Sequence, residues 1–288
     1  MSRLPHACAR RPGARQGLTL LALLLALQAA PVAAQQAESR SHSTAAEPQA
    51  SRNAQAEARQ GAGRSYTPGA FQRLEISGAA DVRLLQGDRD EVFIAGDEET
   101  QKSVTVQLRG NRLEIQPSGN WKFWRSKRLQ MEVTVRQLEN LELSGNGEVH
   151  APATFRAQRL SLSISGSGLV RFDDLQAQRL HFAVAGSGEG QLRGQVDSLS
   201  LAISGKGKLQ AEQLRSERAA VAISGVGQAQ LWVTRSLSVA VMGVGTVDYW
   251  GSPQVSRDAS GLAKINARGE TPPGALSPAG DGARQERQ

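Results

Sequence analysis

One segment of the sequence combines aromatic and cationic side chains closely enough to contact a ligand surface. Residues 121–128 read WKFWRSKR and hold two of the four tryptophans of the chain together with four cations. Aromatic rings stack on sugars or lie at membrane interfaces, while lysine and arginine attract phosphate groups and anionic lipid headgroups. The simpler alternative is the start of a strand, with one tryptophan buried and the cations solvated. The candidate contact residues are Trp121, Lys122, Trp124, Arg125, Lys127 and Arg128.

Few groups of residues in the sequence could form a catalytic site. Asp173 and Asp174 come nearest to the paired carboxylates of a glycosidase, but adjacent strand residues point to opposite faces, which favours a solvated turn. His150 and His181 stand at different phases of the repeat described below, and surface or strand histidines are the favoured interpretation. Residues 186–190 lack the spacing and the following helix of a phosphate-binding loop. We therefore predict no enzyme activity, and no catalytic residue, metal or cofactor.

The amino terminus has the pattern of a secretory signal peptide. Four arginines precede a short apolar run over residues 18–30, and small residues follow at 32–34. The run is shorter than the roughly 20 apolar residues that a spanning helix needs. We predict a signal peptide over residues 1–34 and an exported mature chain without a transmembrane span. Its expected location is the periplasm, the outer envelope or the medium.

Removal of this leader changes the charge and the redox chemistry of the chain. It takes away four arginines and no acidic residue, so the formal net charge falls from +7 to +3. This weak basicity gives no support to a nucleic-acid partner. The leader also contains Cys8, the one cysteine of the chain. A mature chain without thiols excludes disulfides, cysteine-ligated zinc and a cysteine nucleophile.

A tetrapeptide of the form x-Gly-x-Gly recurs six times, at intervals of 18–21 residues. The residues two, four and six positions before each first glycine are apolar, as in Leu160, Leu162 and Ile164, and this period of two indicates a strand with one buried face. The repeats leave no room for a crossover helix. We therefore predict an all-β fold, a right-handed β-solenoid of about 20-residue coils with a β-hairpin insertion in the N-terminal half.

The paired glycines fall at positions that face inward if each strand runs straight. A side chain is absent there because the chain bends, because it lies too close to the opposite wall for a Cβ, or because it needs positive φ at a bulge. Degenerate units at 74–84 and 259–265 fit the atypical ends of a solenoid. The twelve glycines given a structural role are Gly145, Gly147, Gly166, Gly168, Gly186, Gly188, Gly205, Gly207, Gly225, Gly227, Gly243 and Gly245.

Composition and periodicity together divide the chain into five parts. Polar stretches without large apolar side chains cannot offset their ordering entropy, so they are expected to be disordered. A tight hairpin is predicted at Gly110 and Asn111, between two alternating strands. The predicted parts are the signal peptide at 1–34, a disordered linker at 35–69, an N-terminal β subdomain at 70–143, the solenoid repeats at 144–269 and a disordered tail at 270–288.

The order of these elements resembles a known family. The likeness is carried by FQRLEISG at 71–78, by the ladder of glycine units and by GTVDYWGSP at 245–253, followed by SGL at 260–262. The sequence is similar in this region to the auto-transporter adhesin head domain, also called the GIN domain, of exported bacterial proteins. The resemblance implies a β-solenoid-like fold, an envelope or secreted setting and an adhesive role. It supplies no catalytic residues.

The leading functional hypothesis is a non-enzymatic, exported binding module with an adhesin-like role in the cell envelope or at the cell surface. Two alternatives stay open: a β-helical carbohydrate-active enzyme, either lyase or hydrolase, and a structural or stress-related envelope module. The partner is open among an envelope glycan, an anionic membrane surface and another envelope protein. Converging carboxylates in a cleft would favour the enzyme, and a closed, evenly polar solenoid would favour the binding module.

Overall fold

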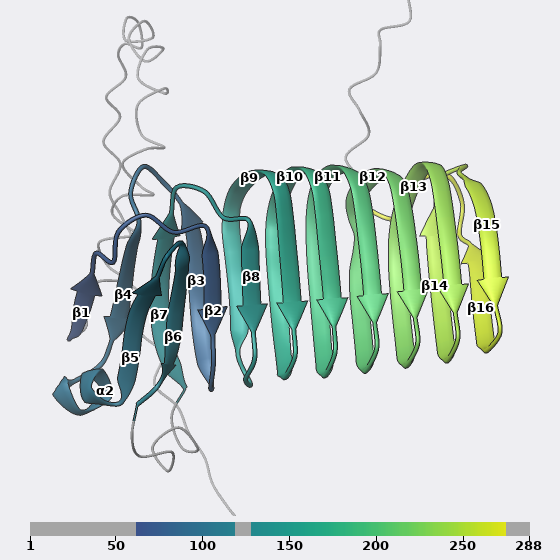
Figure 1. The fold of residues 1–288 in the computed structure, drawn as a ribbon. Coiled ribbons are helices and arrows are strands. Elements are labelled where there is room, and N and C mark those ends of the chain that lie inside the picture. Colours follow the sequence, from purple (N-terminus) through teal and green to yellow (C-terminus); the bar gives the residue numbers. More distant parts are fainter. Residues whose placement is uncertain (1–61, 119–127, 275–288) are drawn as a thin grey trace, which may run out of the picture. The chain divides into compact units, whose positions relative to one another are not determined.

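The computed structural model describes residues 62–118 and 128–274 of the chain. The strands in these ranges join one 16-stranded sheet that winds into successive coils lying side by side (Figure 1). The predicted signal peptide, the linker as far as residue 61 and the tail from residue 275 lie outside the described residues. Within the described ranges, no helix has the length and hydropathy that a membrane span requires.

Five long parallel strands form the main coils of the solenoid. They are β9 (Glu148–Ile164), β10 (Ser167–Val184), β11 (Ser187–Ile203), β12 (Lys206–Ile223) and β13 (Val226–Val241). Three shorter strands, β14 (Val244–Trp250), β15 (Gln254–Ala259) and β16 (Leu262–Ala267), complete the last coils. β14 and β15 pair with β13, and β16 pairs with β14. The all-β solenoid predicted from the glycine period is confirmed.

Alternating apolar residues fill the interior of the coils in register. One stack runs through Leu162, Phe182, Leu201 and Val221, and each of these side chains is at most 3% exposed. The bulkier Phe182 fits because Gly190 of the next coil has no side chain. A Cβ on Gly190 would lie only 2.6 Å from the phenylalanine ring. A large residue in one stack and a missing side chain in its neighbour therefore share the core volume, as close packing requires.

The first glycine of each unit lies directly against the backbone of the preceding coil. A Cβ on Gly186 or Gly205 would overlap the carbonyl oxygen of the first glycine one coil earlier. That same carbonyl accepts a hydrogen bond from the next coil, as between the Val226 amide and the Gly205 oxygen at 2.9 Å. None of the twelve glycines of the repeat has positive φ. Close approach of two backbones, rather than a special conformation, therefore excludes side chains here.

The ladder of first glycines continues at both ends of the solenoid. The Asn146 amide donates to the Gly78 carbonyl at 3.0 Å, and the Leu262 amide donates to the Gly243 carbonyl at 2.9 Å. A Cβ on Gly261 would overlap the Gly243 carbonyl oxygen in turn. The degenerate units at the two ends therefore make the same corner as the regular repeats.

The N-terminal half contributes eight strands and one short helix within the described ranges. β5 and β6 form the predicted antiparallel hairpin across Gly110, which has φ of 63°. β2 pairs in parallel with β6 and β8, and β3 pairs in parallel with β7 and β9, so the sheet continues without a break into the solenoid. The elements are β1 (Gly63–Tyr66), β2 (Arg73–Ile76), β3 (Ala80–Gln86), β4 (Glu91–Ala95), α2 (Glu98–Lys102), β5 (Val104–Arg109), β6 (Arg112–Pro117), β7 (Leu129–Val135) and β8 (Asn140–Leu143).

The predicted linker at 35–69 is wrong at its C-terminal end, because β1 lies within it. β1 pairs antiparallel with β4, with Arg64 opposite Ile94. The segment is ordered by main-chain hydrogen bonds to a sheet edge and by the partly buried Tyr66, rather than by a run of apolar side chains. The start predicted for the tail, residue 270, is too early, because Pro272 is buried and Gly274 lies beside the side chain of Gln213.

Candidate functional site

Arg128 is the one member of the predicted tryptophan and cation segment that the structure describes. Its Nε lies 2.9 Å from Asp81 Oδ1, and its side chain is about half exposed. It lines a cavity that is otherwise formed by the glycine corners. Five other members of the predicted segment lie outside the described residues: Trp121, Lys122, Trp124, Arg125 and Lys127.

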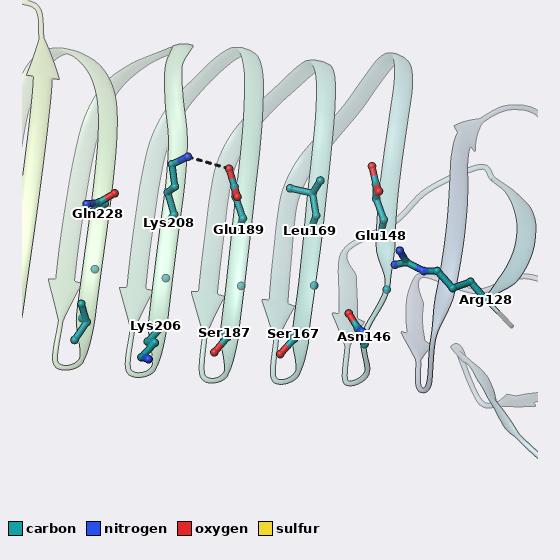
Figure 2. A pocket seen from close by; sticks show the side chains of 16 residues that line it. Arg128, Asn146, Glu148, Ser167, Leu169, Ser187, Glu189, Lys206, Lys208 and Gln228 are labelled. Atoms are coloured by element: carbon teal, nitrogen blue, oxygen red, sulfur yellow. Dashed lines mark hydrogen bonds and ion pairs between the residues drawn. The ribbon is translucent and has the colours of Figure 1, made fainter. Parts of the chain in front are cut away.

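The first candidate site is a groove of about 580 Å³ along the corners of five coils, which we call the corner groove. Arg128 stands at its N-terminal end (Figure 2). The second glycines form its floor: Gly147, Gly168, Gly188, Gly207 and Gly227. One rim holds Asn146, Ser167, Ser187, Lys206 and Val226, and the other holds Glu148, Leu169, Glu189, Lys208 and Gln228.

The sequence builds this groove through the alternation of strand residues. The residues before and after each second glycine point outward, while the position between them presents backbone alone to the solvent. On the inner side, a Cβ at Gly207 would meet Ile203 Cγ2 at 2.8 Å, so a side chain there would have to displace the isoleucine. The second glycines of neighbouring coils pair in register. Equivalent side chains therefore recur about every 4.8 Å along the groove, a geometry suited to an extended ligand lying across the strands.

The charges of the corner groove are nearly balanced. Lys208 Nζ lies 3.3 Å from Glu189 Oε1 on the neighbouring coil, so these two charges neutralise each other (Figure 2). The remaining charged side chains on the rims are Arg128, Glu148 and Lys206. Hydroxyl and amide groups occupy other rim positions. This lining suits a hydroxyl-rich polymer better than a highly charged one, because many hydrogen bonds are offered and little net charge.

The carboxylates of the corner groove do not converge. Glu148 and Glu189 stand at equivalent positions two coils apart, with Leu169 between them. At about 4.8 Å for each coil, their strand positions are about 10 Å apart. A retaining glycosidase places its carboxyl groups about 5–5.5 Å apart and an inverting one about 6.5–9.5 Å apart. Glu189 is also paired with Lys208, which argues against a glycosidase pair made of these two glutamates.

The adjacent aspartates at 173 and 174 lie within β10, so the expected solvated turn is wrong. The pairing of β10 with β9 shifts register between Phe172 and Asp174, and this irregularity turns both carboxylates toward β9. Asp173 Oδ2 lies 2.7 Å from His150 Nε2, and Asp174 accepts a hydrogen bond from Thr154 Oγ1 at 2.6 Å. Each aspartate binds a different partner, so the two do not form a catalytic pair. His150 has a carboxylate neighbour that spacing along the chain did not indicate.

Asp173 is expected to stabilise the fold in a pH-dependent manner. Burial opposes its ionisation, but hydrogen bonds with His150 and Arg171 outweigh burial and hold the pKa of this carboxyl below its ordinary value of 3.8. Because the folded-state pKa is the lower one, this stabilisation is complete above pH 3.8 and is lost as the pH falls through the lowered pKa. We expect Asp173→Asn to cost about 1 kcal/mol at neutral pH and progressively less below the ordinary aspartate pKa.

Urea unfolding at pH 7 and at pH 3 tests this expectation. The matched control is Asp197→Asn, which changes an exposed aspartate on β11 and should leave stability unchanged at both pH values. An equal loss for Asp173→Asn at both pH values would contradict the role given to the ionised carboxyl.

A second cavity, of about 520 Å³, lies on the sheet face that precedes the glycine corner. Arg159 and Arg179 stand in register on β9 and β10 at its edge, and His181 lines its floor. Arg73 and Arg112 close its N-terminal end, and Arg112 is paired with Glu75 at 3.2 Å. This arginine cluster was not predicted from the sequence. A signal was present, because Arg159 and Arg179 each stand seven residues before the first glycine of a repeat. His181 is a surface residue here, as expected.

No group of three His, Cys, Asp or Glu side chains that could hold a metal ion occurs in ranges 62–118 and 128–274. The hydrogen-bonding groups found in the corner groove and in the arginine-lined cavity are positioned by backbone register, coil by coil. Both cavities therefore have the character of binding surfaces on a rigid scaffold.

Comparison with known proteins places this fold and these surfaces in a family. Residues 70–253 match the family model described as "Putative auto-transporter adhesin, head GIN domain". The chain belongs to this family, and the resemblance seen in the sequence is confirmed. Comparison with the curated proteins gives no significant match.

Solved structures of Bacteroides and Parabacteroides proteins share the fold. A "putative adhesin" from Bacteroides fragilis superposes with a TM-score of 0.65 at 23% identity, covering 71% of this chain and 96% of its own. A "putative lipid binding protein" from Parabacteroides distasonis gives a TM-score of 0.58 at 21% identity, with coverage of 72% and 97%. A "putative adhesin" from Parabacteroides merdae gives 0.56 at 17% identity, with coverage of 73% and 96%. At these identities the likeness establishes the fold alone.

Proposed function

We propose that the protein is a non-enzymatic, adhesin-like binding module of the bacterial cell envelope, and that the corner groove holds its ligand. The ligand class that fits is an extended, hydroxyl-rich polymer such as an envelope glycan. The observation that carries the proposal is the groove itself, in which five successive coils present the same two outward positions on a floor without side chains. Membership of an adhesin-like family supports a binding role.

A carbohydrate-active enzyme is the less favoured interpretation of the same groove. Cleavage of a glycosidic bond needs two carboxyl groups flanking one bond, and here Glu148 and Glu189 are two coils apart, with Lys208 bound to the second. Assays for reducing sugar and for unsaturated products on neutral and acidic glycans should therefore stay blank. Product formation that is lost in Glu148→Gln would establish the enzyme instead.

Filling the corner groove tests the binding proposal. Ser187 is exposed on the rim and points away from the core, so Ser187→Tyr should block the groove without disturbing the fold. On an array of bacterial glycans, we expect any glycan bound by the wild type to lose at least about tenfold in affinity with this variant. The matched control is Gln195→Tyr, an equally exposed strand position on the same coil outside the groove.

Two results of the array experiment would count against the groove. Equal binding by the wild type and Ser187→Tyr would place the ligand elsewhere, and a wild type that binds no glycan would remove the proposed ligand class. Unchanged binding by Gln195→Tyr is needed to assign a loss to the groove rather than to a general effect of the added ring.

Export and the boundaries of the mature chain form part of the same proposal. A signal peptide over residues 1–34 would place the protein in the periplasm, on the outer envelope or in the medium. Mass spectrometry of the protein recovered from fractionated cells should then find a chain beginning at residue 35. Recovery of the intact chain from the cytoplasmic fraction would contradict export.

A further inference from the structure

Large apolar side chains gather on the solvent side of the last three corners. Their exposed fractions are 51% for Val226, 71% for Met242, 48% for Val244 and 74% for Leu262. Val226, Val244 and Leu262 pair in register on β13, β14 and β16, and Met242 precedes Val244 by two residues on the same outward side. We call these four residues the apolar ridge. Among the described residues, the other exposed large apolar side chain is Leu108.

The apolar ridge replaces polar residues that occupy the same position in earlier coils. The outward residue after the first glycine changes from asparagine and serine in the first coils to Lys206, and then to Val226, Val244 and Leu262. The fold does not require this change, because the interior stacks are complete without these side chains. A contiguous exposed apolar patch on an otherwise polar surface marks an interaction site.

The sheet face next to the apolar ridge is flat. On β11, β12 and β13 the three outward positions before the corner hold short side chains apart from Met242 itself. A planar partner can therefore approach these positions without meeting a long side chain, and would meet the ridge at their edge. The short side chains are Ser200, Ala202, Ser204, Ala220, Ala222, Ser224, Ser238 and Ala240.

Lysines stand at both ends of the apolar ridge. Lys206 precedes Val226 by one coil in the same row, and Lys264 follows Leu262 by two residues on the same outward side. Among the acidic residues of the last coils, Asp248 is bound by Arg268 at 2.9 Å. Asp258 is exposed and pairs with Ala240 on the adjoining face, so one carboxylate stands against the two lysines. Positive charge therefore borders the apolar side chains, which complements an anionic headgroup layer.

We propose that the apolar ridge docks the protein on an anionic lipid bilayer, with Val244, Leu262 and Met242 inserted at the acyl boundary and the two lysines on headgroups. The ridge lies in the row of outward corner residues on β13, β14 and β16, and of its four members Val226 also borders the corner groove. The ridge consists of four exposed apolar side chains. A stable protein interface buries about 800 Å² on each partner, so the ridge is too small to hold a dimer by itself.

Reversible adsorption is the expected behaviour. A few apolar side chains bind a membrane weakly, and cationic neighbours supply the second contribution that gives measurable affinity. The docking surface shares Val226 and the flanking Lys206 with one end of the groove rim, so a docked molecule would leave free the part of the corner groove nearer Arg128. The inference is independent of which polymer the groove binds.

Vesicle flotation of the full chain tests the proposal. We compare vesicles of phosphatidylcholine alone with vesicles that contain 30% phosphatidylglycerol, using the wild type, Val244→Thr with Leu262→Gln, and Leu108→Gln as the matched control. We expect the double variant to lose about tenfold in partitioning onto the anionic vesicles. The control should match the wild type. Lys206→Gln with Lys264→Gln should abolish the preference for phosphatidylglycerol, and added salt should weaken wild-type binding.

Three results would overturn the proposal. They are equal partitioning of the wild type and the double variant, no preference of the wild type for anionic vesicles, and a wild-type dimer in light scattering that the double variant converts to monomer. The last result would assign the ridge to a second copy of the chain. Circular dichroism of each variant establishes that the fold is retained, and glycan binding by the double variant separates this proposal from the corner groove.

Discussion

Replacing Gly205 with alanine is expected to destabilise the protein by on the order of 3–5 kcal/mol. The added Cβ would overlap the carbonyl oxygen of Gly186, which is backbone and has no rotamer through which to move away. The same carbonyl accepts a hydrogen bond from the Lys206 amide at 2.8 Å, so separating the two coils to admit a methyl group would also break the corner ladder. Overlap and lost hydrogen bonding act together at this position.

A graded set of variants separates this effect from ordinary glycine substitution. Gly207→Ala should cost only about 1–2 kcal/mol, because its Cβ would meet Ile203 Cγ2 at 2.8 Å, and the isoleucine side chain can adjust. Ser187→Ala, at an exposed position, should stay within about 0.5 kcal/mol of the wild type. Urea unfolding followed by tryptophan fluorescence measures all three. Equal losses for Gly205→Ala and Gly207→Ala would refute the backbone-contact explanation.

The glycine repeat shows what the sequence can and cannot predict. Alternation at Leu160, Leu162 and Ile164 was enough to predict strands with one buried face, and the repeat period was enough to predict a solenoid. The reason for the glycines stayed open, because a bend, a close approach and a positive φ leave the same residue type in the sequence. The structure selects close approach, since the contact that excludes a Cβ on Gly205 comes from Gly186, one coil away. Local pattern alone does not show that distance.

The contact between His150 and Asp173 was missed for a related reason. The two residues are 23 positions apart, close to one period, but a register shift between Phe172 and Asp174 brings them together. Alignment of the repeats places His150 opposite Arg171, and the strand pairing has the same register. The additional contact between His150 and Asp173 arises from the register shift, which can be seen only in the three-dimensional pairing of the strands. β1 escaped prediction because main-chain pairing at a sheet edge needs no distinctive side chains.

The corner groove and the apolar ridge were within reach of the sequence once the repeats were aligned. The position between the two glycines reads Asn146, Ser167, Ser187, Lys206 and Val226 along the coils, which already shows a change from polar to apolar. Parity predicts that these residues point outward. The groove required more, because a hollow depends on the curvature of the corner and on what the neighbouring coils place beside it.

Phe172→Ala is expected to cost about 3–5 kcal/mol. Phe172 is fully buried and its ring meets that of Phe155 edge to face, with centroids 5.4 Å apart and an angle of 83° between the planes. The two rings come from β10 and β9 and face each other next to the register shift, where the regular in-register stacks are interrupted. Hydrogen-bonded coils on both sides hold the walls apart, so the space left by a lost ring cannot close.

A double-mutant cycle identifies the contact that fills this space. Phe155→Ala should cost a similar amount, and the double variant should be more stable than the sum of the single losses predicts, by about 1 kcal/mol, because both changes remove the same edge-to-face contact and open the same cavity. Combining Phe172→Ala with Leu237→Ala, in β13 three strands away, should give additive losses. If the aromatic pair were also additive, the irregular part of the coil would be held by other contacts. Coupling confined to the aromatic pair would show that the coil tolerates its irregular register at Asp173 because two aromatic rings fill the interior behind it.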